Sequence, residues 1–556
     1  MNQSPALKKN ECYKAEILSV TGEGFGVCRI GGMVVFVPQT AAGDICDIKI
    51  VKVLSRYAYG IATVFHRLSP ERTEADCPAY QQCGGCCFRH LTYEAELGIK
   101  ETTVRDAFER IGGIHLPPEP ILASPRITGY RNKAQYPVGK AEIGMVYGFY
   151  ANRSHRIIPS RGCPLQPSVF SEIAEYTIGR LNSAGVLPYE EENGKGELRH
   201  LYLRMGEISG EIMLCLVVSR DISKKILPLL PELTGRFPQL KSVVLNLNQR
   251  RDNVILGERC TTLWGESAIE DTLCGLCFSL SPLSFYQVNR TQAERLYGVA
   301  REYAALRGNE TVVDLYCGVG TIGLSMANAC DKLIGVEIIE TAVEDARNNA
   351  ARNGIKNAEF LCADAKTATK ELRKRGVQPD VVLLDPPRKG CDASVVDDVA
   401  AMAPEKVVMI SCNPSTAARD CKLFEEKGYR VARYRPVDMF PRTKHVETVC
   451  LLTREKSVKS YAYVDITPSE LGMGGKVKKP TYKQIQAYVL ETHGLKVSPL
   501  YIANVKDEFG LEKQFSYEEA GMSAKKRPNC PPEKRAAIID ALIHFGMLDE
   551  DARETE

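Results

Sequence analysis

Between residues 281 and 453, short apolar runs alternate with stretches of helical character. The strand-like runs occupy residues 311–315, 333–337, 358–363, 381–385, 406–411 and 446–454. Short apolar strands that alternate with helices are typical of a doubly wound α/β sheet. Ligands bind such sheets at the carboxyl ends of the strands. The residues that follow each run are therefore the first candidates for a functional site.

The chain before this region is rich in predicted strands. Residues 1–70 contain five short runs between glycine-rich turns, at residues 13–20, 27–30, 33–37, 45–53 and 57–65. This pattern predicts a small five-stranded barrel of the OB type, although any small β-barrel would give it too. With eight basic and five acidic residues, the segment is mildly basic. Residues 91–111 follow as a predicted helix, and residues 126–280 look β-rich with a helix over 167–185.

The last hundred residues form a separate segment. Residues 455–480 are linker-like, with GMGG and KVKKP, and a helical stretch follows that ends in a predicted helix over 532–546. Fifteen basic and 15 acidic residues cancel there, which argues against a generally basic nucleic-acid surface, while a helix-turn-helix-like shape stays open. We predict a multidomain α/β protein with four parts, residues 1–70, 71–280, 281–455 and 456–556. The helix over 91–111 is expected to pack on the part formed by residues 281–455.

Composition excludes several classes of protein. The chain has 556 residues, no run of about 18 apolar residues and no apolar segment near its start, so we predict neither a membrane span nor a secretory signal. We expect a cytoplasmic protein whose 20 cysteines are thiols, metal ligands or catalysts rather than disulfides. The net charge of +3 is too small to indicate a nucleic-acid partner by itself.

The first strand of the α/β region leads into a glycine-rich turn and a helix, in VVDLYCGVGTIGLSMA. Gly318 and Gly320 let the backbone pass close to a ligand, and the helix start offers free N–H groups. Gly323 completes a G-x-G-x-x-G spacing, so a dinucleotide is not excluded. Asp314 favours a cofactor without phosphates, namely S-adenosylmethionine, unless it only organises the loop.

Acidic residues end the next two strands. Glu337 closes LIGVE, where a carboxylate can bind the two hydroxyls of a ribose. Asp364 follows the third strand in LCADA. Both positions extend the predicted cofactor site.

The later strands end in residues that suggest a reaction. Asp385 lies in LLDPPRKG, and Cys412 lies in SCNP after the next strand. A thiol beside a helix start and a cofactor cleft is a candidate nucleophile, although a buried structural cysteine is the ordinary alternative. Glu447 begins the last strand in MFPRTKHVETV. A lone glutamate is usually solvated, so only this arrangement marks Glu447 out.

Three cysteines fall within ten residues in CPAYQQCGGCCFRH, and a fourth follows in RGCPLQP. Four thiolates can hold either zinc or an iron–sulfur cluster. A zinc ribbon usually has two C-x2-C pairs, so C-x5-C-x2-C with a lone fourth cysteine favours a cluster on Cys77, Cys83, Cys86 and Cys163. Cys87 is a rival ligand, and a reduced structural group is the alternative to any metal site.

Six strings occur in the order found in the RNA uracil-5-methyltransferase family, which the chain resembles: SPLSFYQVN, DLYCGVGTIGL, LIGVEI, LLDPPRKG, SCNP and MFPRTKHVE. The N-terminal region resembles a TRAM domain, and the cysteine region looks like that of the 23S ribosomal RNA branch of the family. The resemblance covers about residues 11–454. It implies methylation of carbon 5 of a uridine with S-adenosylmethionine as the methyl donor.

The resemblance also implies roles for individual residues. It implies that Cys412 is the nucleophile and Glu447 the general base, and that the four cysteines hold a 4Fe-4S cluster. The family often has a histidine where this chain has Arg442, which puts the local substrate contacts in doubt. The implied S-adenosylmethionine ligands are Gln287, Tyr316, Glu337 and Asp385.

An RNA partner follows from this chemistry. The target base must leave any stack to reach Cys412, so a loop or a refolded stem is the expected substrate. The family has a motif near its substrate cleft similar to GYRNKAQYPVG, although an ordinary surface strand is the alternative. The candidate RNA contacts there are Tyr130, Arg131, Asn132, Lys133 and Gln135.

Several interpretations compete. The cluster cysteines and the TRAM-like region favour 23S rRNA over tRNA, and we expect a monomer. A non-catalytic RNA-binding or chaperone protein is the alternative from another class, which the intact Cys412, Glu447 and glycine-rich loop disfavour. A DNA cytosine methyltransferase shares the logic of thiol addition, but Cys412 stands in SCNP rather than in a Pro-Cys loop.

Overall fold

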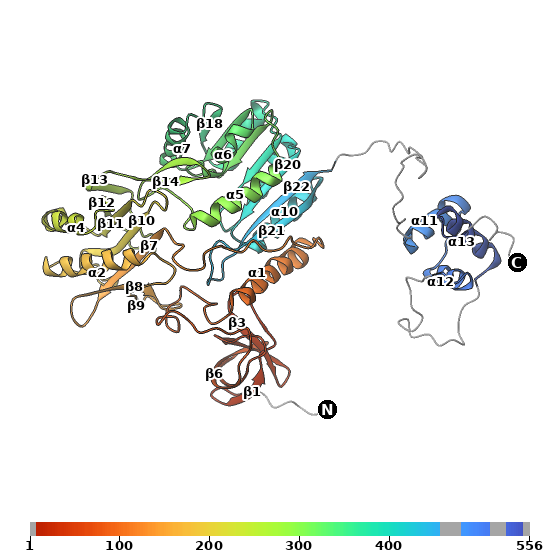
Figure 1. The fold of residues 1–556 in the computed structure, drawn as a ribbon, viewed down its shortest axis with the longest axis horizontal. Coiled ribbons are helices and arrows are strands. Elements are labelled where there is room, and N and C mark those ends of the chain that lie inside the picture. The colour runs from red at the N-terminus through yellow and green to blue at the C-terminus, as the bar shows by residue number, and fades with distance from the viewer. Residues whose placement is uncertain (1–6, 456–479, 512–529, 549–556) are drawn as a thin grey trace. The chain divides into compact units, whose positions relative to one another are not determined.

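The computed structural model divides into two compact units, residues 1–457 and 458–556 (Figure 1). Most of the linker predicted over 455–480 lies outside the residues that the structure describes. Within the described residues, every helix is too short or too polar to span a membrane. The described ranges are 7–455, 480–511 and 530–548.

The first unit begins with a small barrel of six strands, β1 (Cys12–Glu16), β2 (Ser19–Val20), β3 (Phe25–Ile30), β4 (Met33–Pro38), β5 (Ile45–Val53) and β6 (Tyr57–Arg67). They pair in the order β1-β5-β6-β4-β3-β2. The run predicted over 13–20 is divided in two because the chain changes partners: β1 pairs with β5, and β2 pairs with β3. Buried and outward-facing residues alternate along β3, β4 and the first half of β6, as the period of two requires.

A second sheet of seven strands has the order β13-β12-β11-β10-β7-β8-β9. Its strands are β7 (Lys133–Lys140), β8 (Met145–Tyr150), β9 (Ile157–Pro159), β10 (Leu198–Met205), β11 (Ile212–Val218), β12 (Leu240–Leu247) and β13 (Arg259–Gly265). Apolar side chains pack against one face of this sheet from three helices, α2 (Ser168–Ser183), α3 (Ser223–Ile226) and α4 (Leu230–Arg236). The helix predicted over 167–185 is α2.

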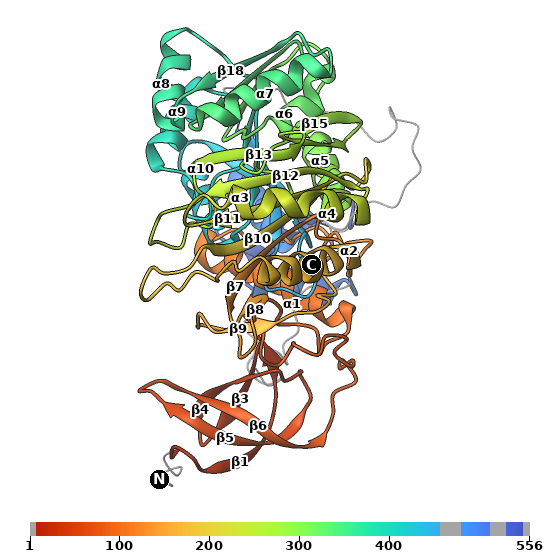
Figure 2. The ribbon, with the colours of Figure 1, turned by 90° about the vertical axis from the view of Figure 1, so that its left-hand side faces the viewer.

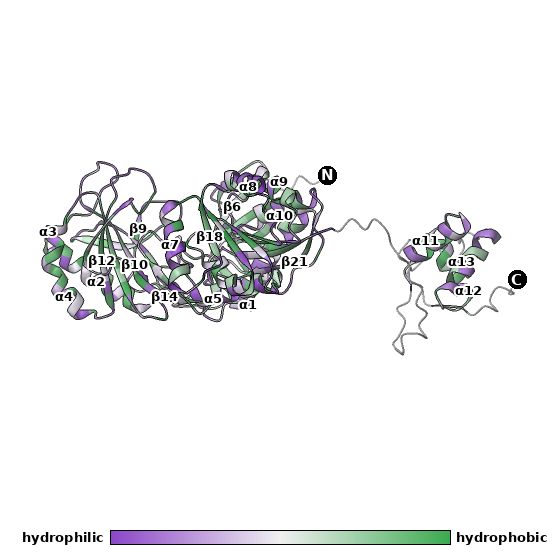
Figure 3. Ribbon diagram, turned by 90° about the horizontal axis from the view of Figure 1, so that it is seen from above, coloured by the Kyte–Doolittle hydropathy of each residue, from purple (hydrophilic) through white to green (hydrophobic). Residues whose placement is uncertain are grey.

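The third sheet has the order β18-β17-β16-β19-β20-β22-β21, and its strands run in one direction except β22, which lies antiparallel between β20 and β21. Its strands are β16 (Thr311–Leu315), β17 (Lys332–Glu337), β18 (Ala358–Cys362), β19 (Val381–Leu384), β20 (Lys406–Ser411), β21 (Tyr429–Val437) and β22 (Glu447–Arg454). The connecting helices include α5 (Arg290–Ala304), α6 (Thr321–Met326), α7 (Glu340–Arg352), α8 (Ala365–Lys374), α9 (Ala393–Met402) and α10 (Pro414–Glu425). Apolar residues gather on the strands, whereas α7 and α8 carry many polar residues (Figure 3). The predicted doubly wound sheet is confirmed.

Two elements from earlier in the chain pack against this α/β sheet. The hairpin of β14 (Ile269–Leu273) and β15 (Leu276–Leu280) adds buried residues to one of its cores. Helix α1 (Tyr93–Ala107) adds Val104 and Ala107 to the other core, next to α10. The ring of Phe108, just after α1, stacks on Tyr434 of β21 with 4.2 Å between centroids.

A buried ion network ties α1 to the loop that precedes β22. The Lys100 ammonium lies 2.7 Å from Glu96 Oε1 and 2.7 Å from Asp438 Oδ1, and it donates to the Phe440 carbonyl at 3.2 Å. The backbone N–H of Arg442 donates to Glu96 Oε1 at 2.7 Å. The three ionic side chains are at most 1% exposed. A buried ion pair that loses one partner typically costs about 3–5 kcal/mol, so this network strongly restrains the loop.

The second unit is a small helical module of α11 (Tyr482–His493), α12 (Pro499–Glu508) and α13 (Pro532–His544). Thr481 and Gln484 form a capping box at the start of α11, and Gly494, with φ +65°, ends that helix. The helices share an apolar core that includes Ile485, Ile502 and Leu542. The predicted final helix is therefore present, and it ends at His544.

Candidate functional site

Polar side chains follow neighbouring strand ends along one edge of the α/β sheet. Strands β17, β16, β19, β20 and β22 are neighbours in that order, and each contributes one residue at this edge. Strand β22 runs antiparallel, so its first residue lies where the parallel strands end, and Ser411 pairs with Thr448. In order across the sheet, the residues are Glu337, Tyr316, Asp385, Cys412 and Glu447.

All five residues line one cleft of about 1040 Å³. Gln287 and Gly318 line the same cleft, as do Arg388, Phe440 and His445. The structure thus brings the predicted nucleophile and base together with four predicted cofactor ligands, Gln287, Tyr316, Glu337 and Asp385.

Glu337 organises the glycine turn at one end of the cleft. Its carboxylate accepts the backbone N–H of Gly318 at 3.1 Å. It also accepts those of Ile338 and Ile339 at 2.8 and 2.9 Å. Three N–H groups therefore hold the carboxylate in place where the cleft is lined by the turn.

Three predicted cofactor residues do not line the cleft. Asp314 is buried, and its Oδ2 accepts the N–H of Gly323 at 2.9 Å, so it organises the loop. Gly320 has φ +84° and supplies the left-handed turn before α6. Asp364 caps α8 by accepting from the N–H and hydroxyl of Thr367 at 3.0 and 2.6 Å. Asp314, Gly320 and Asp364 thus shape the turns beside the cleft, and their assignment to the cofactor site stays a prediction.

Burial raises the pKa of two carboxyl groups at this edge, those of Asp385 and Glu447. The pKa of Asp385 rises to about 7 for this reason. The pKa of Glu447 rises to about 8, with a further increase from Asp385 and an opposing effect of Arg388. Burial, then Glu447, raises the pKa of the Cys412 thiol, and Arg388 lowers it. Arg388 is thus the cation that favours the charged forms of both Cys412 and Glu447.

The sequence alone does not single out Arg388 and His445. Arg388 donates to His445 Nδ1 at 2.8 Å. Burial lowers the pKa of His445 to about 4, so the imidazole is neutral and accepts this bond. The available signal was their position inside LLDPPRKG and MFPRTKHVE, close to Asp385 and Glu447.

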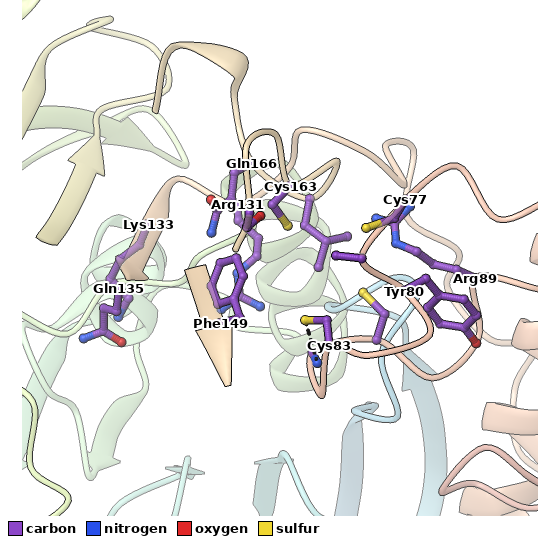
Figure 4. Close-up of a pocket in the computed structure, with 15 residues that line it drawn as sticks. Cys77, Tyr80, Cys83, Arg89, Arg131, Lys133, Gln135, Phe149, Cys163 and Gln166 are labelled. Atoms are coloured by element: carbon purple, nitrogen blue, oxygen red, sulfur yellow. Dashed lines mark hydrogen bonds between the residues drawn. The ribbon is translucent and has the colours of Figure 1, made fainter. Parts of the chain in front are cut away.

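The predicted cluster cysteines line a second cavity, of about 250 Å³ (Figure 4). Figure 4 shows the sulfurs of Cys77, Cys83 and Cys163 around one space. Cys86 lines this cavity as well, whereas Cys87 is not among its lining residues. The side chain of Cys87 lies against Gly24 of the barrel instead. Of the two rival ligands, Cys86 therefore lies at the cavity and Cys87 lies away from it.

Among the described residues, no group of three or more His, Cys, Asp or Glu side chains is arranged to hold a metal ion. A four-iron cluster is larger than one ion, so its ligands stand further apart than those around zinc. Arg89 also lines the cavity, pairs with Asp76 and lowers the pKa of Cys86, against the stronger effect of burial. Apart from the Cys86 thiol, its buried Nε and Nη2 have no hydrogen-bond partner among the described residues. A buried cation beside four thiols fits an anionic group in this cavity.

The predicted RNA contacts divide into two groups. Tyr130 is 1% exposed and donates to the Pro441 carbonyl at 3.0 Å, so its ring cannot stack on a base. Asn132 is also buried and donates to the Gln287 carbonyl at 2.9 Å. For these two residues the prediction is corrected. The other three line the cysteine cavity rather than the large cleft: Arg131, Lys133 and Gln135.

Comparison with known proteins agrees with this geometry. Residues 274–455 match the family described as tRNA (Uracil-5-)-methyltransferase, and residues 7–63 match the TRAM domain. An uncharacterized RNA methyltransferase of Bacillus cereus is 42% identical over 452 residues, which are 81% of this chain and 98% of that protein. Another from Halalkalibacterium halodurans is 40% identical over 451 residues, with the same coverage.

A solved structure has the same architecture over most of its length. The crystal structure of Pyrococcus abyssi tRNA (uracil-54, C5)-methyltransferase in complex with S-adenosyl-L-homocysteine superposes with a TM-score of 0.64 and 29% identity. The match covers 79% of this chain and 99% of that one. Fold and site together define an RNA methyltransferase that uses S-adenosylmethionine. The chain belongs to the RNA uracil-5-methyltransferase family, in the group with an N-terminal TRAM domain.

The buried carboxyl of Asp314 generates a pH-dependent prediction. Its pKa is about 8 in the fold, raised chiefly by burial, and about 4 in an unfolded chain. A raised carboxyl pKa means that stability falls as pH rises between these values, by at most about 1.4 kcal/mol per pH unit for each such group. We therefore compare thermal unfolding at pH 6 and pH 8 without added cofactor, because this range lies between the unfolded and folded pKa values. Between these two pH values, Asp314→Asn should lose less stability than the wild type.

Asp392→Asn is the matched control. Asp392 is an exposed cap of α9, and its hydrogen bonds to Ser394 lower its pKa. It is therefore ionised in both states throughout this pH range, and its variant should follow the wild-type pH dependence. Equal pH dependence of the wild type and Asp314→Asn would contradict the argument.

Proposed function

We propose that this protein methylates carbon 5 of a specific uridine in 23S ribosomal RNA, with S-adenosylmethionine as the methyl donor. One observation carries the proposal. A thiol and a carboxyl group, Cys412 and Glu447, stand at adjacent strand ends in the cleft that contains the proposed cofactor ligands. Those ligands are Gln287, Tyr316, Glu337 and Asp385.

In the first step, the thiolate of Cys412 adds to carbon 6 of the uracil ring. Carbon 5 is a poor nucleophile, and this addition turns the ring into an enolate that can react. Carbon 5 then takes the methyl group from the sulfonium of S-adenosylmethionine, which leaves as S-adenosylhomocysteine. Arg388 supports the addition because its charge favours the thiolate form of Cys412.

In the second step, Glu447 removes the proton from carbon 5. The electron pair restores the double bond between carbons 5 and 6, and the Cys412 thiolate leaves. A general base works best with a pKa near the working pH, and burial brings that of Glu447 to about 8.

The substrate assignment rests on the parts outside the cleft. The four cysteines around one cavity and the TRAM domain support 23S rRNA within this family. The Pyrococcus abyssi protein is described as acting on tRNA, so a tRNA is the second candidate substrate. A non-catalytic RNA-binding protein is the alternative if no methylation is found.

The substrate is tested by deleting the gene and measuring 5-methyluridine in separated 23S and transfer RNA by nucleoside mass spectrometry. We expect loss from 23S RNA, with restoration by the wild-type gene and none by a Cys412→Ala gene. Loss from transfer RNA alone would keep the chemistry and refute the ribosomal substrate. No loss from either, with the protein shown to be expressed, would count against methylation.

Because the two catalytic residues act in different steps, their substitutions should have different effects. Cys412→Ala should abolish turnover and covalent attachment, because no thiolate can add to the ring. Glu447→Gln should abolish turnover but accumulate a covalent RNA–protein adduct, because the proton at carbon 5 stays in place. A denaturing gel with labelled RNA measures both. Cys391→Ala, a buried thiol outside the cleft, serves as control. A Glu447→Gln protein that is active and free of adduct would contradict the assigned role.

The cysteine cavity supports a 4Fe-4S cluster held by Cys77, Cys83, Cys86 and Cys163. Methyl transfer requires no electrons, so such a cluster would hold the cysteine loops in place near the RNA. Protein purified without oxygen should be brown and contain iron and sulfide. Cys163→Ser should lose the colour, whereas Cys87→Ser should keep it. A colourless wild-type protein with stoichiometric zinc would refute the cluster.

A further inference from the structure

His445 lines the large cleft, but the two steps described above give its imidazole no role. The residue stands two positions before Glu447, in the loop that leads into β22. Its side chain is half-buried, so part of the ring is open. A polar ring in this place is near enough to Glu447 to contact the same nucleobase.

Arg388 occupies one of the two ring nitrogens of His445. Nη2 of Arg388 lies 2.8 Å from Nδ1 of His445. A guanidinium has donors only, so Nδ1 accepts this hydrogen bond and carries no proton. Burial, together with nearby cations, lowers the pKa of His445 to about 4, so the ring is neutral. A neutral imidazole has a single N–H, which is therefore on Nε2.

The Nε2–H group of His445 has no partner in the described part of the chain. The other polar contact of this residue is its backbone N–H, which donates to Thr443 Oγ1 at 3.3 Å. Nε2 is also absent from the fully enclosed side-chain atoms that lack a hydrogen bond among the described residues. It is therefore accessible, and because the ring lines the cleft, the N–H can donate to a molecule bound there.

Neighbouring residues hold this donor in place. The Phe440 ring, which also lines the cleft, packs edge-on against His445 with 6.0 Å between centroids. Thr443 donates its hydroxyl to the Phe440 carbonyl at 2.8 Å, which closes the turn before His445. Lys444 pairs outside the cleft with Glu23, 2.6 Å away, in the turn before β3 of the barrel at one end of the first unit (Figure 2). A donor that is fixed in advance costs no reorganisation when charge develops beside it.

Thiolate addition develops charge that such a donor can stabilise. As the Cys412 sulfur bonds to carbon 6, the electron pair of the double bond between carbons 5 and 6 moves toward carbon 4, and oxygen 4 becomes an enolate oxygen. When carbon 5 takes the methyl group, the pair returns and the carbonyl at carbon 4 is restored. A hydrogen bond to oxygen 4 therefore lowers the barrier to addition without transfer of its proton. Oxygen 4 is next to carbon 5, the atom from which Glu447 takes a proton, and so belongs on the side of the ring near His445.

We propose that Nε2–H of His445 donates a hydrogen bond to oxygen 4 of the target uracil. This inference rests on the proposed function, because it takes that uracil as the substrate. Arg388 is the positioning residue for this donor, since its bond to Nδ1 keeps the proton on Nε2. Cytosine has an amino group at carbon 4, which donates where uracil accepts. The same contact therefore selects uridine over cytidine.

Two substitutions separate the functions of the two ring nitrogens. His445→Asn places an amide oxygen near the position of Nδ1, so it can still accept from Arg388, but it has no donor at the position of Nε2. His445→Gln reaches the position of Nε2 with an amide N–H group and should recover part of the activity. Thermal unfolding and binding of S-adenosylhomocysteine verify that both full-length variants are folded.

The substrate is an RNA fragment that carries the uridine identified by gene deletion, with uridine, 4-thiouridine or 2-thiouridine at that position. Single-turnover methylation of the uridine fragment should be slower in His445→Asn by on the order of 100-fold, the usual loss when one such donor is removed. Sulfur is a weak acceptor, so with 4-thiouridine the difference between wild type and variant should nearly vanish. With 2-thiouridine, which keeps oxygen 4, the full difference should remain.

His115→Asn is the matched control, because His115 is exposed and does not line the cleft. Its rates should equal those of the wild type on all three fragments. An equal loss in His445→Asn on all three fragments, or no loss on any of them, would overturn the contact with oxygen 4. Failure of the proposed function is recognised separately: a folded wild-type protein that methylates none of the fragments would refute methylation itself, and this contact with it.

Discussion

Lys100 neutralises two buried carboxylates that belong to distant parts of the chain. Glu96 is one turn away on α1, whereas Asp438 lies in the loop between β21 and β22. Burying an unpaired carboxylate is expensive, so the fold keeps the three groups together. The network thereby holds the loop at Asp438 and Phe440, and this restrains the segment that leads to Glu447 at the start of β22. The position of Glu447, the proposed base, thus depends on α1, a helix that precedes the whole α/β sheet in the chain.

Arg442 fits the same network. Its backbone N–H donates to Glu96, and its guanidinium donates to the Leu91 carbonyl at 2.9 Å. The side chain that departs from the family pattern also contacts α1, because its guanidinium lies 3.5 Å from Glu96 Oε2. It is a support of the loop, which accounts for a cation at this position without a direct role in substrate contact.

Much of the α/β region could be predicted because its information is local. Apolar runs mark β16 to β20, and polar residues at their ends mark the cleft, since parallel strands end at one edge. The sequence left Asp314 open between a cofactor ligand and a loop organiser, and it did not reveal that Asp364 caps a helix, because a carboxylate that caps a turn and one that binds a ligand look alike in sequence. Strand β21 was also missed, since YRVARYRPV alternates basic and apolar residues and contains Pro436. Those features suit an edge strand. Arg433 of this strand forms ion pairs with Glu119 and Glu302, which hold the edge in place.

The antiparallel pairing of β20 with β22 has a consequence for how this family can change. Side chains alternate along a strand, so a one-residue insertion inside β20 or β22 would turn Cys412 or Glu447 to the opposite face. The loop before β22 has no such constraint beyond the ions that hold it. Length variation among relatives should therefore be absent within these two strands and confined to the segments that join them. The pairing register of β20 and β22 sets the spacing of the Cys412 thiol and the Glu447 carboxyl, and no single side-chain contact has to maintain it.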